Sequence, residues 1–189
     1  MLDISAQLAG SRRYMHQIAS VATVRQRRAS ILMVCLAGVL LGALTRTVQA
    51  DPQPDAGMMR PVLDLVRYMS MLPSDRSPDF FASRGVCIVE NFAPFVFCGP
   101  AAVSRWDAGF REHSHAETLR DLRASFGPAH DLSSHGDRVY FSLPTTWTGL
   151  SDGRHFVERG AWAFVLRRTA AGWKILGYGW GVYSYRETR

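Results

Sequence analysis

The sequence predicts an α+β fold in which helices of the first half pack against a curved antiparallel sheet of the second half. Apolar residues recur at helical spacing over 58–69, which is the pattern of one buried helix face. Apolar and polar residues alternate over 138–147, 154–168 and 173–185, and this period of two is typical of strands. Helices followed by an antiparallel meander are the element order of the α+β class.

The basic character of the chain belongs to its N-terminal segment. The whole chain has 22 basic and 16 acidic residues, a formal charge of +6. Residues 1–50 hold six of the basic residues and one of the acidic residues, so residues 51–189 have a net charge of only +1. A nearly neutral domain has no stripe of cations to replace the counterions of a phosphate backbone. Nucleic acid is therefore not an expected partner.

The N-terminal segment has the parts of a secretory signal. Three arginines over 25–28 precede an uncharged, mostly apolar run over 31–44, and residues 48–50 form a small-residue cleavage pattern. The run is short for a membrane span, which needs about 20 residues. Met15 and Met33 are alternative translation starts, because the segment is long for such a leader.

These features predict the organisation of the chain. Residues 1–50 are expected to be a signal segment cleaved after Ala50, residues 51–57 a polar linker, and residues 58–189 the mature domain. The mature protein would then be exported, either to the periplasm or outside the cell. The alternative is an uncleaved leader, through which alone the protein would contact a membrane.

Two helices are expected at the start of the mature domain. The first covers 58–69, where Pro61 fits the first turn and Pro73 prevents extension. The second is short and starts at Ser77, a residue type that is favoured as an N-cap. It is expected to carry two aromatic side chains, Phe80 and Phe81.

A third helix is expected to open at Gly99-Pro100. Its apolar face would consist of Val103, Trp106, Phe110 and His113. After it, Leu119, Leu122 and Phe126 indicate either another helical turn or a wide loop, which Gly127-Pro128 ends.

A β-hairpin is expected between the second and third helices. The short runs 86–90 and 95–98 flank a four-residue loop, and in this register Cys87 faces Cys98. Cβ atoms across an antiparallel pair lie about 4.5–5.5 Å apart, whereas a disulfide needs about 3.8 Å. A bridge is therefore feasible with some strain. Cleavage would remove Cys35 and leave an even pair, which also favours a bridge in an exported protein; the alternative is two buried free thiols.

The last strand, 173–185, has glycine at every second position from Gly177 to Gly181. Its other face carries the larger side chains Leu176, Tyr178, Trp180 and Val182. Glycine inside a strand usually marks a bend or a close approach of another backbone. We therefore expect curvature or close packing at this face, and the alternative is a slot for a ligand.

Five segments within residues 58–185 carry a family resemblance: Phe80-Phe81, 86–95, 99–106, 136–140 and 172–175 with Trp180. In this order they resemble the nuclear transport factor 2-like superfamily, more narrowly its SnoaL-like and ketosteroid-isomerase-like branch. The resemblance implies a cone-shaped α+β barrel, in which a curved sheet wraps around N-terminal helices and a pocket opens at the wide end. It also implies that the open face of the sheet commonly forms a homodimer.

The ketosteroid isomerases use three polar groups in catalysis, and this chain has a residue that resembles only one of them. A tyrosine late in the first helix helps to form the oxyanion hole there, and Tyr68 resembles it. The general base is an aspartate where this chain has Asn91, which cannot accept a proton, and the second acid would fall near Ala163 or Phe164. Glu90 is expected on the opposite face, because neighbours on a strand alternate. Proton abstraction by that mechanism is therefore not expected.

Four polar residues remain as candidates for catalysis: Tyr68, Glu90, Asn91 and His113. The plain alternative is that Asn91 begins the hairpin turn and that Glu90 is solvated. The wall of the pocket is expected to come from Tyr68, Asn91, Trp106, Phe110, Tyr140, Trp162 and Trp180. The aromatic members of this set could equally serve as core packing.

The sequence predicts neither a metal site nor a cofactor site. His113 and His115 are two residues apart on a helix, where side chains do not face the same way. The usual spacings of zinc ligands are absent. The glycines from Gly177 to Gly181 follow a strand alternation and precede no helix, so they do not form a phosphate loop.

The leading functional hypothesis is an exported domain that binds an unknown small apolar molecule in an aromatic pocket. One alternative is a cofactor-free isomerase, cyclase or dehydratase that uses the four polar candidates. Another is a homodimeric association module, because the strands over 162–166 and 173–183 have apolar residues on both faces. The sequence does not decide whether any reaction is catalysed.

Overall fold

The structure, a computed structural model, describes residues 51–71 and 78–188. The predicted signal segment, residues 1–50, lies outside the described residues. Within them the elements are α2 (Ala56–Ser70), β1 (Cys87–Val89), β2 (Val96–Cys98), α3 (Ala102–Ala116), β3 (Arg120–Phe126), β4 (His130–His135), β5 (Arg138–Ser151), β6 (Arg154–Thr169) and β7 (Gly172–Thr188). In this part of the chain no helix combines the length and the apolar character that a membrane crossing requires.

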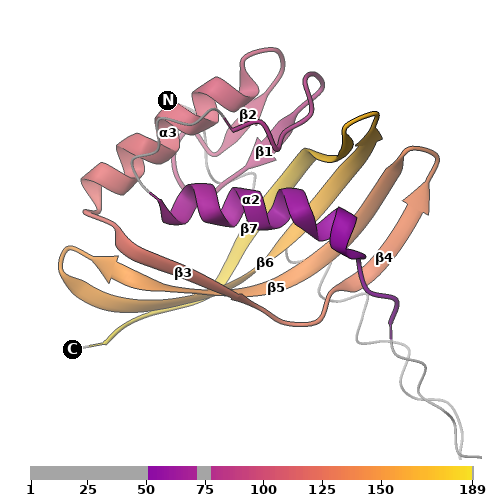
Figure 1. The fold of residues 1–189 in the computed structure, drawn as a ribbon. Coiled ribbons are helices and arrows are strands. Elements are labelled where there is room, and N and C mark those ends of the chain that lie inside the picture. The colour runs from indigo at the N-terminus through magenta and orange to yellow at the C-terminus, as the bar shows by residue number, and fades with distance from the viewer. Residues whose placement is uncertain (1–50, 72–77, 189) are drawn as a thin grey trace, which may run out of the picture. The chain divides into compact units, whose positions relative to one another are not determined.

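The strands form one curved sheet in the order β2-β1-β7-β6-β5-β3, and β4 pairs with β5. The long strands β5, β6 and β7 form an antiparallel meander, whereas β1 pairs with β7 in parallel, so the sheet is mixed. Helix α2 contacts β7 and β3, and α3 contacts β1 and β2 (Figure 1). The predicted α+β fold, a curved sheet around helices of the first half, is confirmed.

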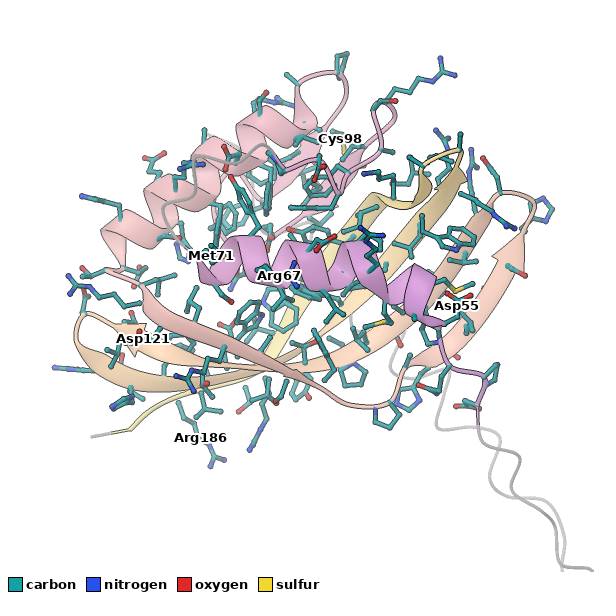
Figure 2. The ribbon with its side chains drawn as sticks, in the orientation of Figure 1. Asp55, Arg67, Met71, Cys98, Asp121 and Arg186 are labelled. Carbon is teal, nitrogen blue, oxygen red and sulfur yellow. A yellow bond between two sulfur atoms is a disulfide. The ribbon has the colours of Figure 1, made fainter. Side chains whose placement is uncertain are left out.

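Helix α2 confirms the first predicted helix and begins slightly before it. The carboxylate of Asp55 accepts a hydrogen bond from the backbone N–H of Met58 at 2.8 Å, and this N-cap places the start of the helix inside the predicted linker 51–57 (Figure 2). Pro61 consequently lies inside the helix rather than in its first turn. The buried face continues from Pro61 with Val62, Leu65, Tyr68 and Met69.

The helix predicted at Phe80 and Phe81 is wrong for its described part, because residues 78–81 form a turn and an isolated bridge to β7. The backbone N–H of Ile175 donates to the carbonyl of Phe80 at 2.9 Å, and the N–H of Ala82 donates to the carbonyl of Ile175 at 2.8 Å. These backbone groups pair with the sheet and so cannot form helical bonds. The predicted N-cap, Ser77, lies outside the described residues.

The segment after α3 is a strand, not the helical turn or wide loop that we expected. Leu122, Ala124 and Phe126 lie two residues apart and are more buried than the exposed residues between them, so the true period is that of a strand. β3 pairs with β5, where Ala124 lies opposite Trp147. β4 was not expected either, because its residues are polar and mostly exposed.

The inner face of the meander holds the large apolar side chains. On β5 the buried residues alternate as predicted, with Val139, Phe141, Leu143 and Trp147 inward. On β7 the pairing slips by one residue, because Leu166 pairs with Ile175 and Val165 pairs with Gly177. This bulge places the fully buried Ile175 inward, together with Tyr178 and Trp180, whereas the sequence had placed it on the glycine face.

The hairpin β1–β2 has the predicted register, in which Ile88 lies opposite Phe97 and Cys87 lies opposite Cys98. The two cysteines are joined by a disulfide and are exposed, so they are not the buried thiols of the alternative interpretation. Ile88 and Phe97 are buried, and they therefore mark the face of the hairpin that turns toward the interior. The hairpin is thereby held between α3 and β7, beside the cavity described next.

Candidate functional site

A cavity of about 180 Å³ lies between the helices and the inner face of the sheet. Most of its wall is apolar and aromatic, and it is formed by Met69, Phe92, Phe110, Leu119, Leu122, Trp147, Phe156, Trp162, Trp180 and Tyr185. Its polar side chains are Glu90, Asn91, His113, Glu117, Ser151 and Glu158. Most of the lining residues lie in α2, α3, β3, β5, β6 and β7, and Glu90 and Asn91 lie directly after β1. The cavity therefore depends on both helices and on most of the sheet.

Glu90 is the most deeply buried polar group of the cavity, with 5% of its surface exposed. Its backbone N–H donates to the carbonyl of Phe95 at 2.9 Å, which continues the hairpin pairing past β1. Its carboxyl oxygen Oε1 accepts hydrogen bonds from the indole Nε1 of Trp106, at 3.1 Å, and from the hydroxyl of Tyr178. The expectation that Glu90 faces away from the pocket is therefore wrong.

The error concerns which face of the hairpin is the inner one. Neighbouring residues do alternate, since Val89 and Asn91 are exposed whereas Ile88 and Glu90 are buried. The comparison with ketosteroid isomerases had placed Asn91 toward the pocket and so turned Glu90 outward. The buried Ile88 marks the inner face, so Glu90 points inward, whereas Asn91 also lines the cavity but remains exposed.

Burial makes Glu90 an unusual acid. The loss of hydration raises its pKa from 4.5 to about 7, and the hydrogen bonds from Tyr178 and Trp106 only partly oppose this shift. The carboxylate of Glu158 adds to the increase, since a second negative charge faces the same interior. Glu90 therefore exchanges its proton near neutral pH.

Glu158 and His113 are the other partly buried titratable groups of the cavity. Burial raises the pKa of Glu158, although its Oε1 accepts a hydrogen bond from the Nε1 of Trp180 at 3.1 Å. Burial lowers the pKa of His113, and the nearby charge of Glu117 opposes that change. The imidazole of His113 stacks on the ring of Phe92, with 5.2 Å between ring centroids. The site thus combines two carboxyls of raised pKa with a largely neutral imidazole.

The architecture matches solved structures of one superfamily. A nuclear transport factor 2-like superfamily protein from Salmonella enterica has a TM-score of 0.54 to this chain at 11% identity, over 66% of this chain and 87% of that chain. The chain has the nuclear transport factor 2-like fold. A hexachlorocyclohexane dehydrochlorinase, LinA type 2, has a TM-score of 0.58 at 9% identity, over 71% of this chain and 88% of that chain.

A Novosphingobium aromaticivorans protein that bears the name of scytalone dehydratase is also similar to this chain. Its TM-score is 0.55 at 9% identity, over 70% of this chain and 86% of that chain. No family model matches the sequence, and no curated protein matches it. At these identities the similarity concerns the fold, and the site has to be interpreted from its own residues.

The nuclear transport factor 2-like fold brings together only part of the predicted site. Of the predicted pocket residues, the cavity is lined by Asn91, Phe110, Trp162 and Trp180. Trp106 is fully buried behind the wall, where it donates to Glu90. Tyr140 is 37% exposed and faces outward, because its strand neighbours Val139 and Phe141 face inward.

Among the four catalytic candidates, Glu90, Asn91 and His113 line the cavity, whereas Tyr68 does not. The hydroxyl of Tyr68 donates to Asp107, and the Arg111 guanidinium donates to the same hydroxyl at 3.0 Å. The network fixes α2 against α3. Tyr68 therefore supports the packing of the two helices rather than the oxyanion hole that the resemblance implied.

Several residues of the site were missed by reasoning from the sequence. Glu158 lies two residues after the inward Phe156 and four before the inward Trp162, so strand parity alone identifies it as inward. Glu117 follows the end of α3, where the predicted helix had no defined end. Tyr185 follows the second register shift of the β6–β7 pairing. A register shift changes which alternate residues face inward, so the alternation of the sequence could not place Tyr185.

The arrangement can accept and release protons inside an apolar enclosure. Glu90 is held by two donors, and His113 lines the same cavity from a different element. Within residues 51–71 and 78–188, no group of three or more metal-ligating side chains gathers in one place.

Proposed function

We propose that the protein binds a small, largely apolar molecule in the cavity between its helices and its sheet. The observation that carries the proposal is the cavity of about 180 Å³ with an aromatic wall and a few convergent polar groups. A cavity of about 150 Å³ is large enough for benzene, so the ligand is expected to have about the size of a single substituted ring. The name of the dehydrochlorinase neighbour, which contains the single-ring hexachlorocyclohexane, supports the same size class.

The test is a screen of single-ring compounds by thermal shift and tryptophan fluorescence. Trp147, Trp162 and Trp180 line the cavity, so a bound ligand should change the emission. At a ligand concentration of 100 times Kd, the unfolding midpoint should rise by about 9 °C. Leu122→Trp, which fills the cavity, should abolish both signals. Leu63→Trp is the matched control, because Leu63 is 46% exposed on α2; equal binding by both variants would remove the proposal.

A second candidate function is a cofactor-free isomerase, cyclase or dehydratase. It is favoured by the convergence of Glu90, Asn91 and His113 on one cavity. A general base works best when its pKa is near the working pH, and burial brings Glu90 to about 7. In this interpretation the Glu90 carboxylate would remove a proton from one carbon and return the same proton to another, while Asn91 and the neutral His113 would orient a carbonyl group.

Proton exchange at carbon provides the measurement for this second function. Single-ring ketones incubated with the protein in heavy water should take up deuterium next to the carbonyl, which proton NMR detects. Glu90→Gln should slow the exchange by about 10²–10⁴-fold. Glu112→Gln serves as the control, because Glu112 is exposed on α3 and does not line the cavity. Exchange at the wild-type rate in Glu90→Gln would exclude Glu90 as the base.

Export and dimerisation complete the proposal. Export to the periplasm or outside the cell is supported by the Cys87–Cys98 disulfide, since such bonds persist in oxidising compartments. A homodimer is supported by exposed apolar residues of β7, with Val182 38% and Tyr183 69% exposed. Sequencing the N-terminus of the mature protein tests cleavage after Ala50, and light scattering at micromolar concentration tests the dimer.

A further inference from the structure

Three carboxyl groups enter the cavity from three different parts of the fold. Glu90 comes from the hairpin after β1, Glu117 from the end of α3, and Glu158 from β6. Among the described residues that line the cavity there is no lysine or arginine. Ser151 donates to a carboxylate oxygen of Glu117 at 3.4 Å, and Trp180 donates to Glu158 at 3.1 Å, so neutral groups orient these acids.

A neutral apolar ligand would leave the negative charges of these carboxyl groups without a positive partner. Filling the cavity with such a molecule removes the remaining water from Glu158 and Glu90, whose ionised forms already suffer from burial. A cationic ligand would instead pair with them, and charge-assisted hydrogen bonds from an ammonium group are the stronger kind. His113 does not compete for this role, because burial favours its neutral form.

The aromatic wall suits the same kind of ligand. The rings of Trp147 and Trp162 are inclined at 73° with centroids 6.0 Å apart, and those of Trp162 and Trp180 at 68° with centroids 5.5 Å apart. These inclined rings form adjacent walls of one cavity. Tryptophan faces attract cations through the ring quadrupole, and the attraction is larger where water is excluded.

We propose that the cavity selects a compact organic cation, a protonated amine on a single aromatic or alicyclic ring, over a neutral molecule of the same shape. The inference rests on the proposed binding function and deepens it by naming the ligand class. The ammonium group lies between Glu90 and Glu158, and the ring lies against the tryptophans. Glu117, at the exposed end of the cavity, adds to the negative potential.

The test compares two probes of equal size, benzylammonium and ethylbenzene, by tryptophan fluorescence of the purified protein at pH 8. We expect benzylammonium to bind about tenfold more tightly or better. Glu158→Gln and Glu90→Gln should each remove most of this preference, because benzylammonium binding weakens whereas ethylbenzene binding does not weaken. Glu112→Gln, outside the cavity, should keep the wild-type preference.

The pH dependence gives a second readout. Between pH 6 and pH 8 the affinity for benzylammonium should rise several-fold, because Glu90 loses its proton there, and the affinity for ethylbenzene should not rise. The groups that face Glu90 are Trp106 from α3, Tyr178 from β7 and Glu158 from β6. His113, Glu117 and Tyr185 share the cavity and contribute to the profile.

The possible outcomes separate this inference from the proposed function. If ethylbenzene binds as tightly as benzylammonium, the preference for a cation is overturned and the binding function stands. If neither probe nor any compound of the single-ring screen binds, both are overturned. Benzylammonium binding that is unchanged in Glu90→Gln and in Glu158→Gln would place the cation elsewhere and overturn the inference.

Discussion

Glu90→Gln should stabilise the protein at pH 8 by about 3 kcal/mol relative to wild type and should have almost no effect at pH 4. The figure follows from the pKa of Glu90, which burial raises from 4.5 to about 7, at about 1.4 kcal/mol for each pH unit. Glutamine has nearly the shape of glutamate and keeps an acceptor oxygen for Trp106 and Tyr178. The variant therefore removes the buried charge without removing the two hydrogen bonds.

The sign of the pH dependence follows from proton binding. Between pH 4.5 and pH 7 the folded protein holds a proton on Glu90 that the unfolded chain has already released, so folding takes up a proton. The favourable contribution of neutral Glu90 is fully present below pH 4.5 and is lost as the pH rises to about 7. Above pH 7 the wild type carries the whole penalty of a buried carboxylate, and the glutamine variant does not.

Urea unfolding of wild type and variant at intervals from pH 4 to pH 8 measures the effect. The quantity to follow is the difference in unfolding free energy between the two proteins, because the titration of His113 and other groups occurs in both and largely cancels. Glu112→Gln is exposed and should give a difference near zero at every pH. A flat difference for Glu90→Gln would mean that the folded state does not raise this pKa.

A stabilising substitution at a buried acid would also indicate what the glutamate is for. Proteins retain strained or destabilising groups mainly where activity needs them. Glu90 accepts hydrogen bonds from the buried Trp106 and Tyr178, so glutamine, which keeps an acceptor oxygen, is the substitution that separates the charge from the packing. A stabilising Glu90→Gln substitution would therefore support the proposal that the glutamate serves a ligand rather than the packing.

The sequence was sufficient for those elements in which one pattern dominates. The alternation of β5 and the helical spacing of α2 each place large apolar residues on one face, and both elements were predicted. The hairpin register was also predictable, because a four-residue loop fixes which residues lie opposite each other. The bulge at Leu176 was not predictable, since both Ile175 and Leu176 are apolar and either one could face inward.

The site was harder to predict than the fold because it depends on which face of each strand is inner. Strand alternation correctly placed Glu90 and Asn91 on different faces, but the comparison with the ketosteroid isomerases turned the wrong face inward. The local sequence does not decide the face, because Cys87, Ile88 and Val89 are all apolar, and only the structure shows that Ile88 is the buried one. The turn at Phe80 lay beyond sequence reasoning, because its partner Ile175 is 95 residues away along the chain.

Gly177→Ala should destabilise the protein by about 3 kcal/mol, the upper part of the range for overpacking. A Cβ atom at this position would clash with the backbone carbonyl oxygen of Cys87. The contact is with backbone rather than with a flexible side chain, so β1 would have to move away from β7. Glu90 follows β1 directly, and its hydrogen bond from Tyr178 joins the same pair of strands. A movement of β1 should therefore break this bond and shift Glu90 from its place in the cavity.

Gly179→Ala is the matched control, because its added Cβ would meet nothing nearer than the Cβ of Val89 at 3.9 Å, an ordinary contact. Both glycines lie on the same strand face and both pair with β1, so intrinsic strand preference changes equally in the two variants. Urea unfolding should show a loss for Gly177→Ala and a change within about 0.5 kcal/mol for Gly179→Ala. Equal unfolding free energies for the two variants would mean that β1 can move away from β7 without loss of stability. A selective loss would show that one glycine sets the distance between the two strands, and with it the position of Glu90.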